Sequence, residues 1–327
     1  MDQVFSPGGA GQGDTASHRH VSALASNAGS SLVTVIVNPI SGTHGRRGVG
    51  RQRAEQAAGL LSTHGMTPEV FVTERRGHAH ELAVAARARG TRLVLAWGGD
   101  GTVNEVASAL TFTDTVLGIV PAGSGNGLAR ELGIPLDPAG AVAAAVRGRE
   151  WVIDAGELGG HLFFNVAGYG LDAGVAQQFS ADAASPRGLG QYIRLAGRQL
   201  RAYRPYACTV SVDGVATRTE AMLVAIANSR QYGNGAVVAP QARLDDGRLD
   251  VVVIGHRPAW VAVALAPLLF VGQLARAPRV TMTPATTVEI TASGAMLYHV
   301  DGETHTVDGR LQGRVRPGAL RVCCPVP

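Results

Sequence analysis

A glycine-rich corner between an apolar run and a helical pattern constrains this chain more than any other feature. Residues 93–97 form a β-type apolar run that leads directly into Gly98-Gly99-Asp100-Gly101-Thr102. Glycines at a strand-to-helix corner let backbone N–H groups approach an anion, and the helix N-terminus adds partial positive charge. Asp100 repels a bare phosphate unless a Mg²⁺ ion lies between them. The corner therefore predicts a nucleotide bound together with its metal.

The chain of 327 residues contains no lysine, so all 29 of its basic side chains are arginines. Walker-A nucleotide loops, protein kinases and pyridoxal enzymes each need a lysine at a fixed place, so these three classes are excluded. A phosphate site in this chain has to be built from backbone amides, arginines and metal ions.

Apolar runs alternate with helical patterns over residues 32–149. The runs that predict strands are 32–37, 69–73, 93–97 and 116–120, and helical patterns cover 46–64 and begin again at Gly77. This alternation is typical of a parallel sheet covered on both faces, whose ligands bind at the carboxyl ends of the strands. Polar or glycine residues follow each of the four runs. We therefore predict an α/β nucleotide-binding domain with its site at that edge of the sheet.

From about residue 150 onward, short strands replace that alternation. The runs that predict strands are 151–157, 162–168, 206–213, 220–228, 249–254, 286–291 and 295–300, and helical patterns cover 173–180, 188–203 and 258–275. Short strands separated by Gly, Asp and Asn turns are typical of an antiparallel β-sandwich. We predict a second domain over residues 150–327. Whether its last strands pack back on the first domain is left open by the sequence.

Three turns carry carboxylates with candidate roles. Asp301 and Glu303 flank a glycine and offer a proton acceptor or a Mg²⁺ ligand, as phosphoryl transfer requires, although the same triplet is common in hairpins. Residues 308–309 are interpreted as an ordinary turn of that kind. The adjacent carboxylates at 245–246 fit either a hard-cation site or a solvated turn.

The composition of the chain limits its possible partners and its cellular location. The net charge of +4 is mild, the arginines are scattered and aromatic residues make up 5%, so no nucleic-acid partner is expected. Three cysteines, two of them adjacent, make neither a disulfide framework nor a zinc site and favour a reducing, cytoplasmic setting. Residues 1–31 are expected to be a disordered tail rather than a signal peptide. The apolar stretch 258–275 is interrupted by Pro267 and is expected to be a buried or surface-associated helix rather than a membrane span.

The order of these motifs resembles the catalytic domain of the diacylglycerol kinase family, which includes bacterial lipid kinases and sphingosine kinases. The resemblance covers residues 32–324. It rests on the motifs at 38–42 (Asn-Pro-Ile-Ser-Gly), 77–79, 98–105, 121–130, 164–168 with Asp172, and 301–303. The motif at 98–105 alone is shared with NAD kinases and phosphofructokinases. The run Ser-Gly-Asn-Gly-Leu-Ala-Arg at 124–130 and the late Asp-Gly-Glu narrow the resemblance to the lipid kinases.

The resemblance implies an NAD kinase-like α/β domain set against a β-sandwich domain for the lipid, with the active site in the cleft. ATP is the implied phosphate donor, and the residues expected to line its site are Asn38, Ser41, Thr73, Gly98, Gly99, Asp100, Gly101, Thr102, Val103, Asn104 and Ser124. A structural Mg²⁺ is implied in the second domain, at Asp246 and the carbonyls of Arg243 and Arg248.

The same resemblance implies two candidates for the catalytic base. Glu303 matches the proton acceptor of bacterial members, whereas sphingosine kinases use the residue that matches Asp100. We expect Glu303 to be the base, with Asp301 in the same catalytic motif and Asp100 facing Mg²⁺ or the acceptor hydroxyl.

The expected activity is Mg²⁺-dependent transfer of the ATP γ-phosphate to a hydroxyl of diacylglycerol, a related glycerolipid or a sphingoid base. The enzyme is expected to be cytoplasmic and to visit the membrane surface rather than span the membrane. Two other hypotheses stay open: a kinase for a soluble substrate such as NAD, and a non-catalytic nucleotide-binding regulator. The lipid headgroup and the oligomeric state, with a homodimer as one option, cannot be read from the sequence.

Overall fold

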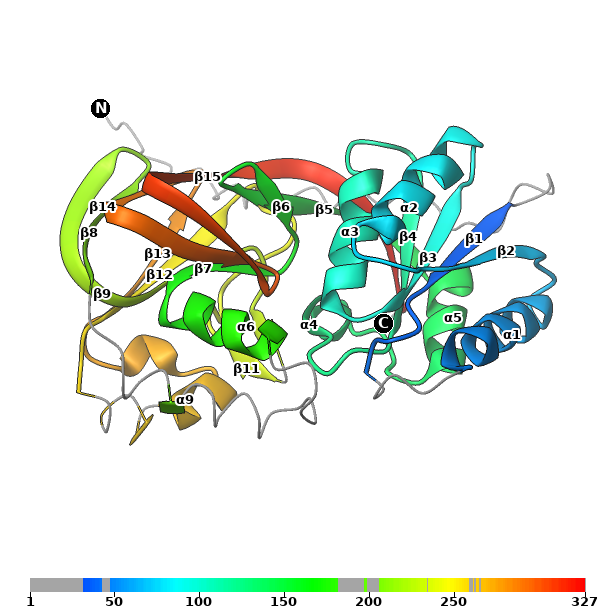
Figure 1. The fold of residues 1–327 in the computed structure, drawn as a ribbon, viewed down its shortest axis with the longest axis horizontal. Coiled ribbons are helices and arrows are strands. Elements are labelled where there is room, and N and C mark those ends of the chain that lie inside the picture. The colour runs from blue at the N-terminus through cyan, green and yellow to red at the C-terminus, as the bar shows by residue number, and fades with distance from the viewer. Residues whose placement is uncertain are drawn as a thin grey trace, which may run out of the picture.

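The structure is a computed structural model that describes residues 32–42, 48–181, 197–198, 206–233, 235–258, 261, 263–264 and 266–326. Figure 1 shows two lobes side by side. The lobe at the right carries the first half of the chain together with the C-terminus, and the lobe at the left consists mainly of strands. Strands β5 (Arg149–Leu158) and β15 (Glu303–Cys324) run from one lobe into the other.

The first lobe is built on a parallel sheet in which the strands follow the order β2-β1-β3-β4. Its strands are β1 (Val33–Val37), β2 (Pro68–Val72), β3 (Leu93–Gly98) and β4 (Val116–Pro121). Its helices are α1 (Val49–Ser62), α2 (His78–Ala88), α3 (Asp100–Leu110), α4 (Gly127–Glu131) and α5 (Pro138–Arg147). Helices α2 and α3 pack together on one face of the sheet, and α1 and α5 cover the other (Figure 1). The predicted α/β domain with a doubly covered parallel sheet is confirmed.

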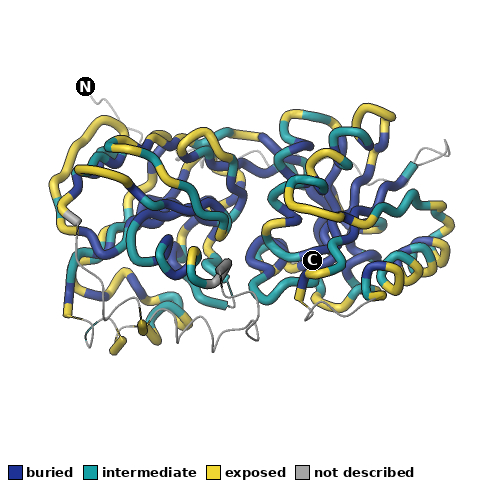
Figure 2. Tube along the Cα trace, in the orientation of Figure 1, coloured by how far each residue is buried: buried dark blue, intermediate teal, exposed yellow. Residues whose placement is uncertain are grey.

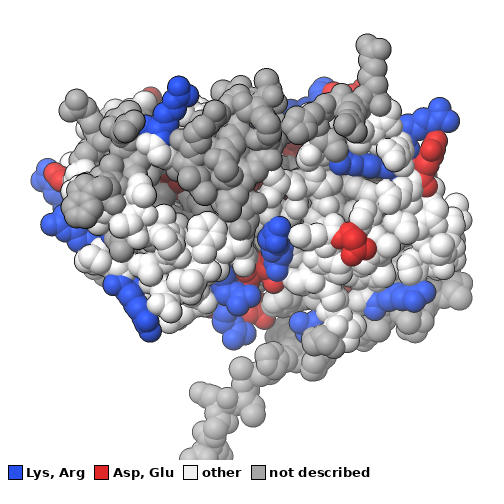
Figure 3. All heavy atoms as spheres, turned by 90° about the horizontal axis from the view of Figure 1, so that it is seen from below, with Lys and Arg blue, Asp and Glu red and all other residues white. Residues whose placement is uncertain are grey.

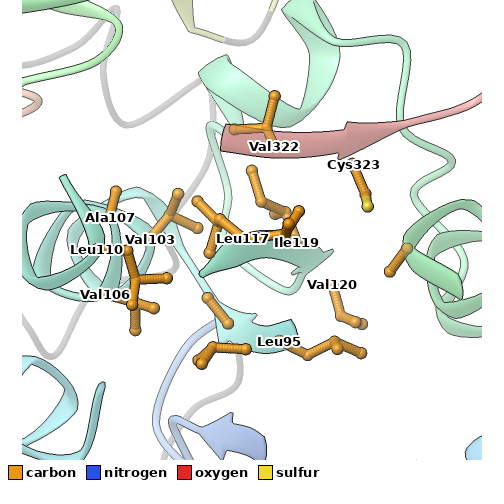
Figure 4. Close-up of a cluster of buried hydrophobic side chains, with 14 of the residues drawn as sticks. Leu95, Val103, Val106, Ala107, Leu110, Leu117, Ile119, Val120, Val322 and Cys323 are labelled. Carbon is orange, nitrogen blue, oxygen red and sulfur yellow. The ribbon is translucent and has the colours of Figure 1, made fainter. Parts of the chain in front are cut away.

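The central strands of this sheet are buried because they are continuous apolar runs. Every residue of β1, β3 and β4 is buried, and Figure 2 shows this layer in dark blue behind helices with exposed outer faces. Helix α3 is amphipathic: Val103, Val106 and Leu110 recur every three or four residues and lie beside Leu117 of β4 (Figure 4). This packing fixes the N-terminus of α3 at the end of β3.

The last strand of the chain completes the sheet of the first lobe. The end of β15 pairs in parallel with β4 through Arg321 and Val322, and Val322 and Cys323 reach into the apolar core there (Figure 4). Strand β5 pairs with β15 in the antiparallel sense from Arg149 to Leu158. The two lobes are therefore joined by a pair of hydrogen-bonded strands rather than by a single linker.

The second lobe is a mainly antiparallel β-sandwich, as predicted. The main path of its strands is β13-β12-β9-β7-β14-β15, while β8 and β7 pair with different stretches of β9 and β14. Its strands are β6 (His161–Phe163), β7 (Val166–Gly170), β8 (Tyr206–Val212), β9 (Val215–Ala227), β12 (Leu249–Gly255), β13 (Val280–Ala285) and β14 (Thr287–Val300). A separate hairpin is formed by β10 (Gln231–Gly233) and β11 (Ala236–Val237), and helix α6 (Leu171–Ala181) packs on β7 and β14.

Three predictions for the strands of this lobe are wrong in detail. The run 162–168 is divided between β6 and β7, with Phe164 and Asn165 between them. The runs 286–291 and 295–300 form one strand, β14, with a bulge between Thr291, which pairs with Arg310, and Ala295, which pairs with Asp308. Residues 308–309, interpreted above as a turn, lie inside β15 opposite that bulge. Gly309 has a φ of 69°, which glycine adopts without strain. Gly309 therefore lies at a bulge, although a glycine is equally typical of a turn.

The stretch 258–275 is not a single helix, contrary to the prediction. Among its described residues, α9 (Pro267–Phe270) is followed by a turn and then by the 3₁₀ helix Leu274–Arg276. Pro267 lies in the first turn of α9, where its missing N–H costs nothing, but it cannot continue a longer helix.

None of the helices in the described part of the chain is long and apolar enough to cross a membrane. The predicted tail 1–31 and, apart from residues 197–198, the predicted helix 188–203 lie outside the described residues.

Candidate active site in the cleft between the lobes

The carboxyl ends of the four parallel strands meet at one edge of the first lobe. At the end of β1, Asn38 donates through Nδ2 to Oγ1 of Thr102, 2.8 Å away, at the start of α3. At the end of β2, the N–H of Thr73 donates to the carbonyl of Val37 at 2.9 Å. The residues predicted at these strand ends are thus neighbours in space, as the parallel sheet requires.

Two glycine loops approach each other closely at the ends of β3 and β4. A Cβ atom on Gly123 would lie 2.7 Å from the Cα of Gly99, so neither loop tolerates a larger residue at this point without moving. The carboxylate of Asp100 bridges the loops, because it accepts hydrogen bonds from the N–H groups of Asn126 at 2.9 Å and Gly127 at 2.7 Å. Burial raises the pKa of Asp100, and these two N–H groups act in the opposite direction. Asp100 therefore holds the two loops together.

Arg53 of α1 holds the loop that follows β1 in place. This role was not predicted from the sequence. Its guanidinium donates to the Asn38 carbonyl at 2.7 Å, to the Ser41 hydroxyl at 2.9 Å and to the Ser41 carbonyl at 2.8 Å. Burial lowers the pKa of Arg53. A guanidinium presents its donors in a fixed fork, so one side chain sets the shape of a loop that carries two predicted ATP contacts. No local pattern marks an arginine on a helix as the partner of a loop twelve residues earlier.

The turn between β14 and β15 is bonded to both lobes through Asp301. Its carboxylate accepts hydrogen bonds from the side chain of Asn104 on α3 at 2.8 Å and from the N–H groups of Phe164, Asn165 and Val166 at 2.9, 3.0 and 3.1 Å. Burial raises the pKa of Asp301, while these donors lower it. With four donors around it, Asp301 is a structural anchor for the Asp-Gly-Glu turn.

Glu303 begins β15, two residues after this anchor. Its carboxylate forms an ion pair with Arg76 of the first lobe. The Nε2 atom of His305 lies 3.7 Å from the same carboxylate oxygen. The side chain of Glu303 is 36% exposed, so it is accessible from solvent.

Glu105 of α3 sets the position of the segment that carries Arg76. Its carboxylate accepts hydrogen bonds from the N–H groups of Gly77 at 3.0 Å and Ala79 at 3.1 Å, at the N-terminus of α2. A carboxylate at this point satisfies free helical N–H groups and complements the helix dipole. The predicted motif Gly-Thr-Val-Asn-Glu therefore connects α3 to the second lobe through Asn104 and to α2 through Glu105.

A cavity lies between the lobes and brings part of the predicted site together. The predicted residues that line it are Gly98, Asp100, Val103, Asn104, Ser124 and Asp301. The second lobe contributes Asp172, Tyr232 and His299, of which only Asp172 was noted in the sequence. The other predicted ATP contacts (Asn38, Ser41, Thr73, Gly99, Gly101 and Thr102) and Glu303 do not line this cavity. They lie at the strand ends and at the turn described above.

The loop predicted to hold a structural Mg²⁺ does not line the cavity either. In it, Asp246 accepts a hydrogen bond from the N–H of Arg248 at 3.0 Å. The buried carboxylate of Asp154 accepts from the N–H of Gly247 at 2.7 Å, and its pKa is raised by burial and by the charges of Asp246 and Asp245. No three His, Cys, Asp or Glu side chains within the described ranges are arranged to hold a metal ion. A cation in this loop would therefore be held by fewer than three such side chains together with backbone carbonyls, and oxygen ligands of both kinds suit a hard ion such as Mg²⁺.

Two family models match successive parts of the chain. Residues 32–158 match the diacylglycerol kinase catalytic domain, and residues 165–324 match the YegS C-terminal NAD kinase beta sandwich-like domain. A "probable lipid kinase YegS-like" protein of Pseudomonas aeruginosa is 33% identical over 86% of this chain and 92% of its own length. A diacylglycerol kinase of Mycobacterium tuberculosis is 31% identical over 83% of this chain and 88% of its own length.

A solved structure shares the fold. The crystal structure of a diacylglycerol kinase from Bacillus anthracis covers 90% of this chain and 97% of its own, with a TM-score of 0.67 and 19% identity. The two domain matches, the relatives above 30% identity over most of the chain and the cleft between the two lobes together show that this chain belongs to the diacylglycerol kinase catalytic-domain family and is a kinase.

Proposed function

We propose that this protein is a lipid kinase that transfers the γ-phosphate of ATP, as its Mg²⁺ complex, to a hydroxyl group of diacylglycerol or a related lipid. The names of its relatives, lipid kinase and diacylglycerol kinase, support the lipid as acceptor. The observation that carries the proposal is the bond from Asn104 to Asp301, which holds the turn bearing Glu303 against the lobe with the two glycine loops. The turn that bears Glu303 thus lies beside the cavity that the glycine loops line, because Asp301 and Gly302 of this turn line it too.

In the proposed reaction the acceptor hydroxyl attacks the γ-phosphorus, the bond from that phosphorus to the β–γ bridging oxygen breaks, and ADP leaves. Glu303 accepts the proton of the attacking hydroxyl. Mg²⁺ supplies charge neutralisation on the phosphates. Within this chain, N–H groups of the two glycine loops bind phosphate oxygens, other than those of Gly123, Asn126 and Gly127, which already donate within the protein. Arg53 keeps the loop after β1 in shape for the nucleotide.

Asp100 and Asp301 are proposed to position these groups rather than to accept the proton. The oxygens of both carboxylates already accept hydrogen bonds from within the protein. For Asp100 to face Mg²⁺ or the acceptor hydroxyl, it would have to give up its bonds to Asn126 and Gly127. Glu303 has no backbone donor among the described contacts and is accessible, which supports it as the base.

The loop around Asp246 is proposed to bind a structural Mg²⁺ through that carboxylate and the carbonyls of Arg243 and Arg248. The crowding of Asp154, Asp245 and Asp246 supports this, because a cation would relieve their mutual repulsion. Binding to the folded state alone stabilises it, so added Mg²⁺ should raise the Tm of the protein. The same addition should leave the Tm of an Asp246→Asn variant unchanged.

Membrane contact is proposed through the segment around α9. Val263, Phe270 and Val271 are 60%, 45% and 62% exposed there. No acidic residue lies between Asp250 and Glu289, whereas the exposed Arg276 and Arg279 do, in addition to the buried Arg257. The face seen in Figure 3, from below in Figure 1 where α9 lies, is mostly uncharged, with separated arginines and a few acidic residues. Exposed apolar side chains with flanking basic residues suit the surface of an anionic bilayer. Cosedimentation with anionic vesicles that is lost in Val271→Ser would support this contact.

Transfer of labelled γ-phosphate tests the proposed function. The acceptors are mixed micelles of diacylglycerol, phosphatidylglycerol, ceramide or sphingosine, with NAD in parallel, and organic and aqueous phases are counted separately. Label in the organic phase is expected, and the labelled species identifies the acceptor. Label in NADP alone, or ATP binding without transfer to any acceptor in a total lipid extract, would contradict the proposal.

A further inference from the structure

A buried histidine contacts the turn that carries the proposed base. His299 is the penultimate residue of β14, and its side chain is 7% exposed, while that of its neighbour Asp172 on α6 is 4% exposed. The Nε2 atom of His299 lies 2.9 Å from Oδ2 of Asp172. On the other side of the ring, Nδ1 accepts a hydrogen bond from the N–H of Gly302 at 3.3 Å.

These two contacts fix which ring nitrogen carries the proton. The N–H of Gly302 is a donor, so Nδ1 of His299 has to present a lone pair to it. In the neutral ring the proton then resides on Nε2, which donates it to Asp172. The hydrogen-bond pattern therefore assigns His299 as the neutral Nε2–H tautomer.

Asp172 serves this arrangement rather than a ligand. Its Oδ2 atom accepts from the hydroxyl of Tyr232 at 2.5 Å as well as from His299, and its Oδ1 accepts from the N–H of Ala173 at 2.8 Å. The ring of Tyr232 stands edge-on to that of His299, with centroids 6.3 Å apart and an angle of 89° between the planes. Both oxygens of the carboxylate are therefore occupied, and the carboxylate holds the imidazole at a fixed angle.

The neighbouring strand leaves room for this cluster. Gly168 of β7 pairs with His299 across the sheet. A Cβ atom at Gly168 would lie 3.0 Å from Nε2 of His299 and would collide with the Asp172 carboxylate. A side chain at this position is thus incompatible with the contact between His299 and Asp172.

The contact to Gly302 satisfies a donor that the turn itself leaves free. Val300 and Glu303 pair across a two-residue loop in which Asp301 has a φ of 45° and Gly302 a φ of 86°, as in a type I′ hairpin. Within such a loop, the N–H of the second residue has no partner in the hairpin. His299 supplies that partner, one peptide bond before Glu303.

We propose that His299, held by Asp172 and Tyr232, is a positioning residue that sets the orientation of the Asp301–Gly302 peptide and thereby, through the turn, of the catalytic carboxylate of Glu303. Asp301 anchors the first half of the turn, and His299 anchors the second half. The kinetic consequence rests on the proposed function, because it requires Glu303 to be the base. The tautomer and the order of the turn do not depend on that function.

Two amide variants separate the two hydrogen bonds of the ring. In His299→Asn the side-chain oxygen can take the place of Nδ1 and still accept from Gly302, but residue 299 no longer donates a hydrogen bond to Asp172. In His299→Gln the side-chain nitrogen can take the place of Nε2 and still donate to Asp172, but the N–H of Gly302 loses its acceptor. Because each variant keeps one contact, a comparison between them distinguishes positioning of the turn from general support of the fold.

We expect kcat to fall about tenfold further in His299→Gln than in His299→Asn, since one hydrogen bond to the turn differs between them. The Kd for ATP is expected to match that of the unmodified protein in both. His80→Gln changes an exposed histidine on α2 and is the control. It should leave kcat, the Kd for ATP and the Tm unchanged. Equal losses of kcat in the two variants, or losses that follow their Tm values, would overturn the proposal.

A measurement without substrate completes the test. In the ¹⁵N-labelled full chain, the ring nitrogens of His299 should show a protonated Nε2 and an unprotonated Nδ1 at neutral pH. The backbone order parameter at Glu303 should fall in His299→Gln and not in His299→Asn. An Nδ1–H tautomer, or equal order in both variants, would overturn the positioning role whether or not the protein phosphorylates lipid. A chain with the expected tautomer and order but without lipid transfer would instead contradict the proposed function.

Discussion

Nδ2 of Asn104 and Oδ2 of Asp301 are hydrogen bonded at 2.8 Å across the two lobes, although 197 residues separate them in the chain. The same amide also donates to the carbonyl of Leu162 at 3.0 Å. One side chain on α3 thus contacts the second lobe at two points. Through these contacts the turn that bears the proposed base lies beside the cavity that the glycine loops line.

Replacement of Asp301 by Asn should destabilise the fold. The amide would turn an N–H₂ group or a neutral oxygen toward four hydrogen-bond donors, and a buried donor left unsatisfied costs about 1–3 kcal/mol. We expect the free energy of unfolding in urea to fall by about 3 kcal/mol in Asp301→Asn. Asp308→Asn, an exposed position on the same strand, should leave it unchanged. Equal midpoints for the two variants would show that the four donors do not stabilise the turn.

Replacement of Gly123 by Ala should weaken ATP binding. The added methyl group would lie 2.7 Å from the Cα of Gly99 and would push the two loops apart. Overpacking of this kind costs about 1–3 kcal/mol, so the Kd for ATP should rise about tenfold to a hundredfold. Gly59→Ala on α1 meets no atom within 4 Å and should leave ATP binding intact. Calorimetric titration with ATP measures both variants, and unchanged affinity in Gly123→Ala would place the nucleotide elsewhere.

Replacement of Arg53 by Lys should raise the KM for ATP by about fivefold to tenfold, because an ammonium group cannot reproduce three contacts made by a planar fork. The effect on kcat should be smaller, since the loop is proposed to bind the nucleotide and not the acceptor. Arg51→Lys is the matched control: Arg51 lies on the same helix and pairs only with Glu55 in an exposed ion pair. Steady-state kinetics at saturating lipid give both constants. A KM that changes equally in the two variants would remove the role assigned to Arg53.

The stability of the protein should fall in mild acid because of His305. Burial and the nearby charge of His161 lower the pKa of His305 below its ordinary value of 6.5. The unfolded chain then binds the proton more readily than the folded one. The stability that neutral His305 contributes is therefore fully present above pH 6.5, and it is lost as the pH falls toward the folded-state pKa. Arg76 also disfavours the proton, and Glu303 favours it.

Urea unfolding at pH 5 and pH 7.5 measures this difference. His305→Gln removes the titrating group, so its free energy of unfolding should change less between the two pH values than that of the unmodified protein. An unchanged pH dependence in the variant would assign the acid lability to other groups.

The architecture of the first lobe could be predicted because it is encoded locally. Continuous apolar runs such as 93–97 identify buried parallel strands, and the glycines that follow them identify the edge at which ligands bind. The bulge at Gly309 could not be distinguished from a turn, because both use a glycine with positive φ. The break at Pro267 was visible in the sequence, but the apolar stretch around it was expected to continue as one helix.

The contacts that assemble the site could be predicted only in part. The Asp-Gly-Glu motif identifies Asp301 and Glu303, but not that Asp301 is surrounded by donors while Glu303 is accessible. Arg53 and His299 contact partners that the fold brings near them. A single arginine or histidine produces no periodic pattern in the sequence from which such a role could be predicted. His299 lies two residues before Asp301, so proximity to the motif is the one signal that pointed to it.

Single-turnover transfer by Glu303→Gln tests the central claim most directly. The enzyme is saturated with labelled Mg-ATP and mixed with the lipid that the transfer assay identifies as acceptor. The organic phase is counted over time, while ATP affinity is measured separately. Loss of a general base should lower the rate of transfer by about a hundredfold or more and leave the Kd for ATP within about twofold. A Glu303→Gln protein that phosphorylates lipid at the full rate would contradict the claim that this carboxylate accepts the proton.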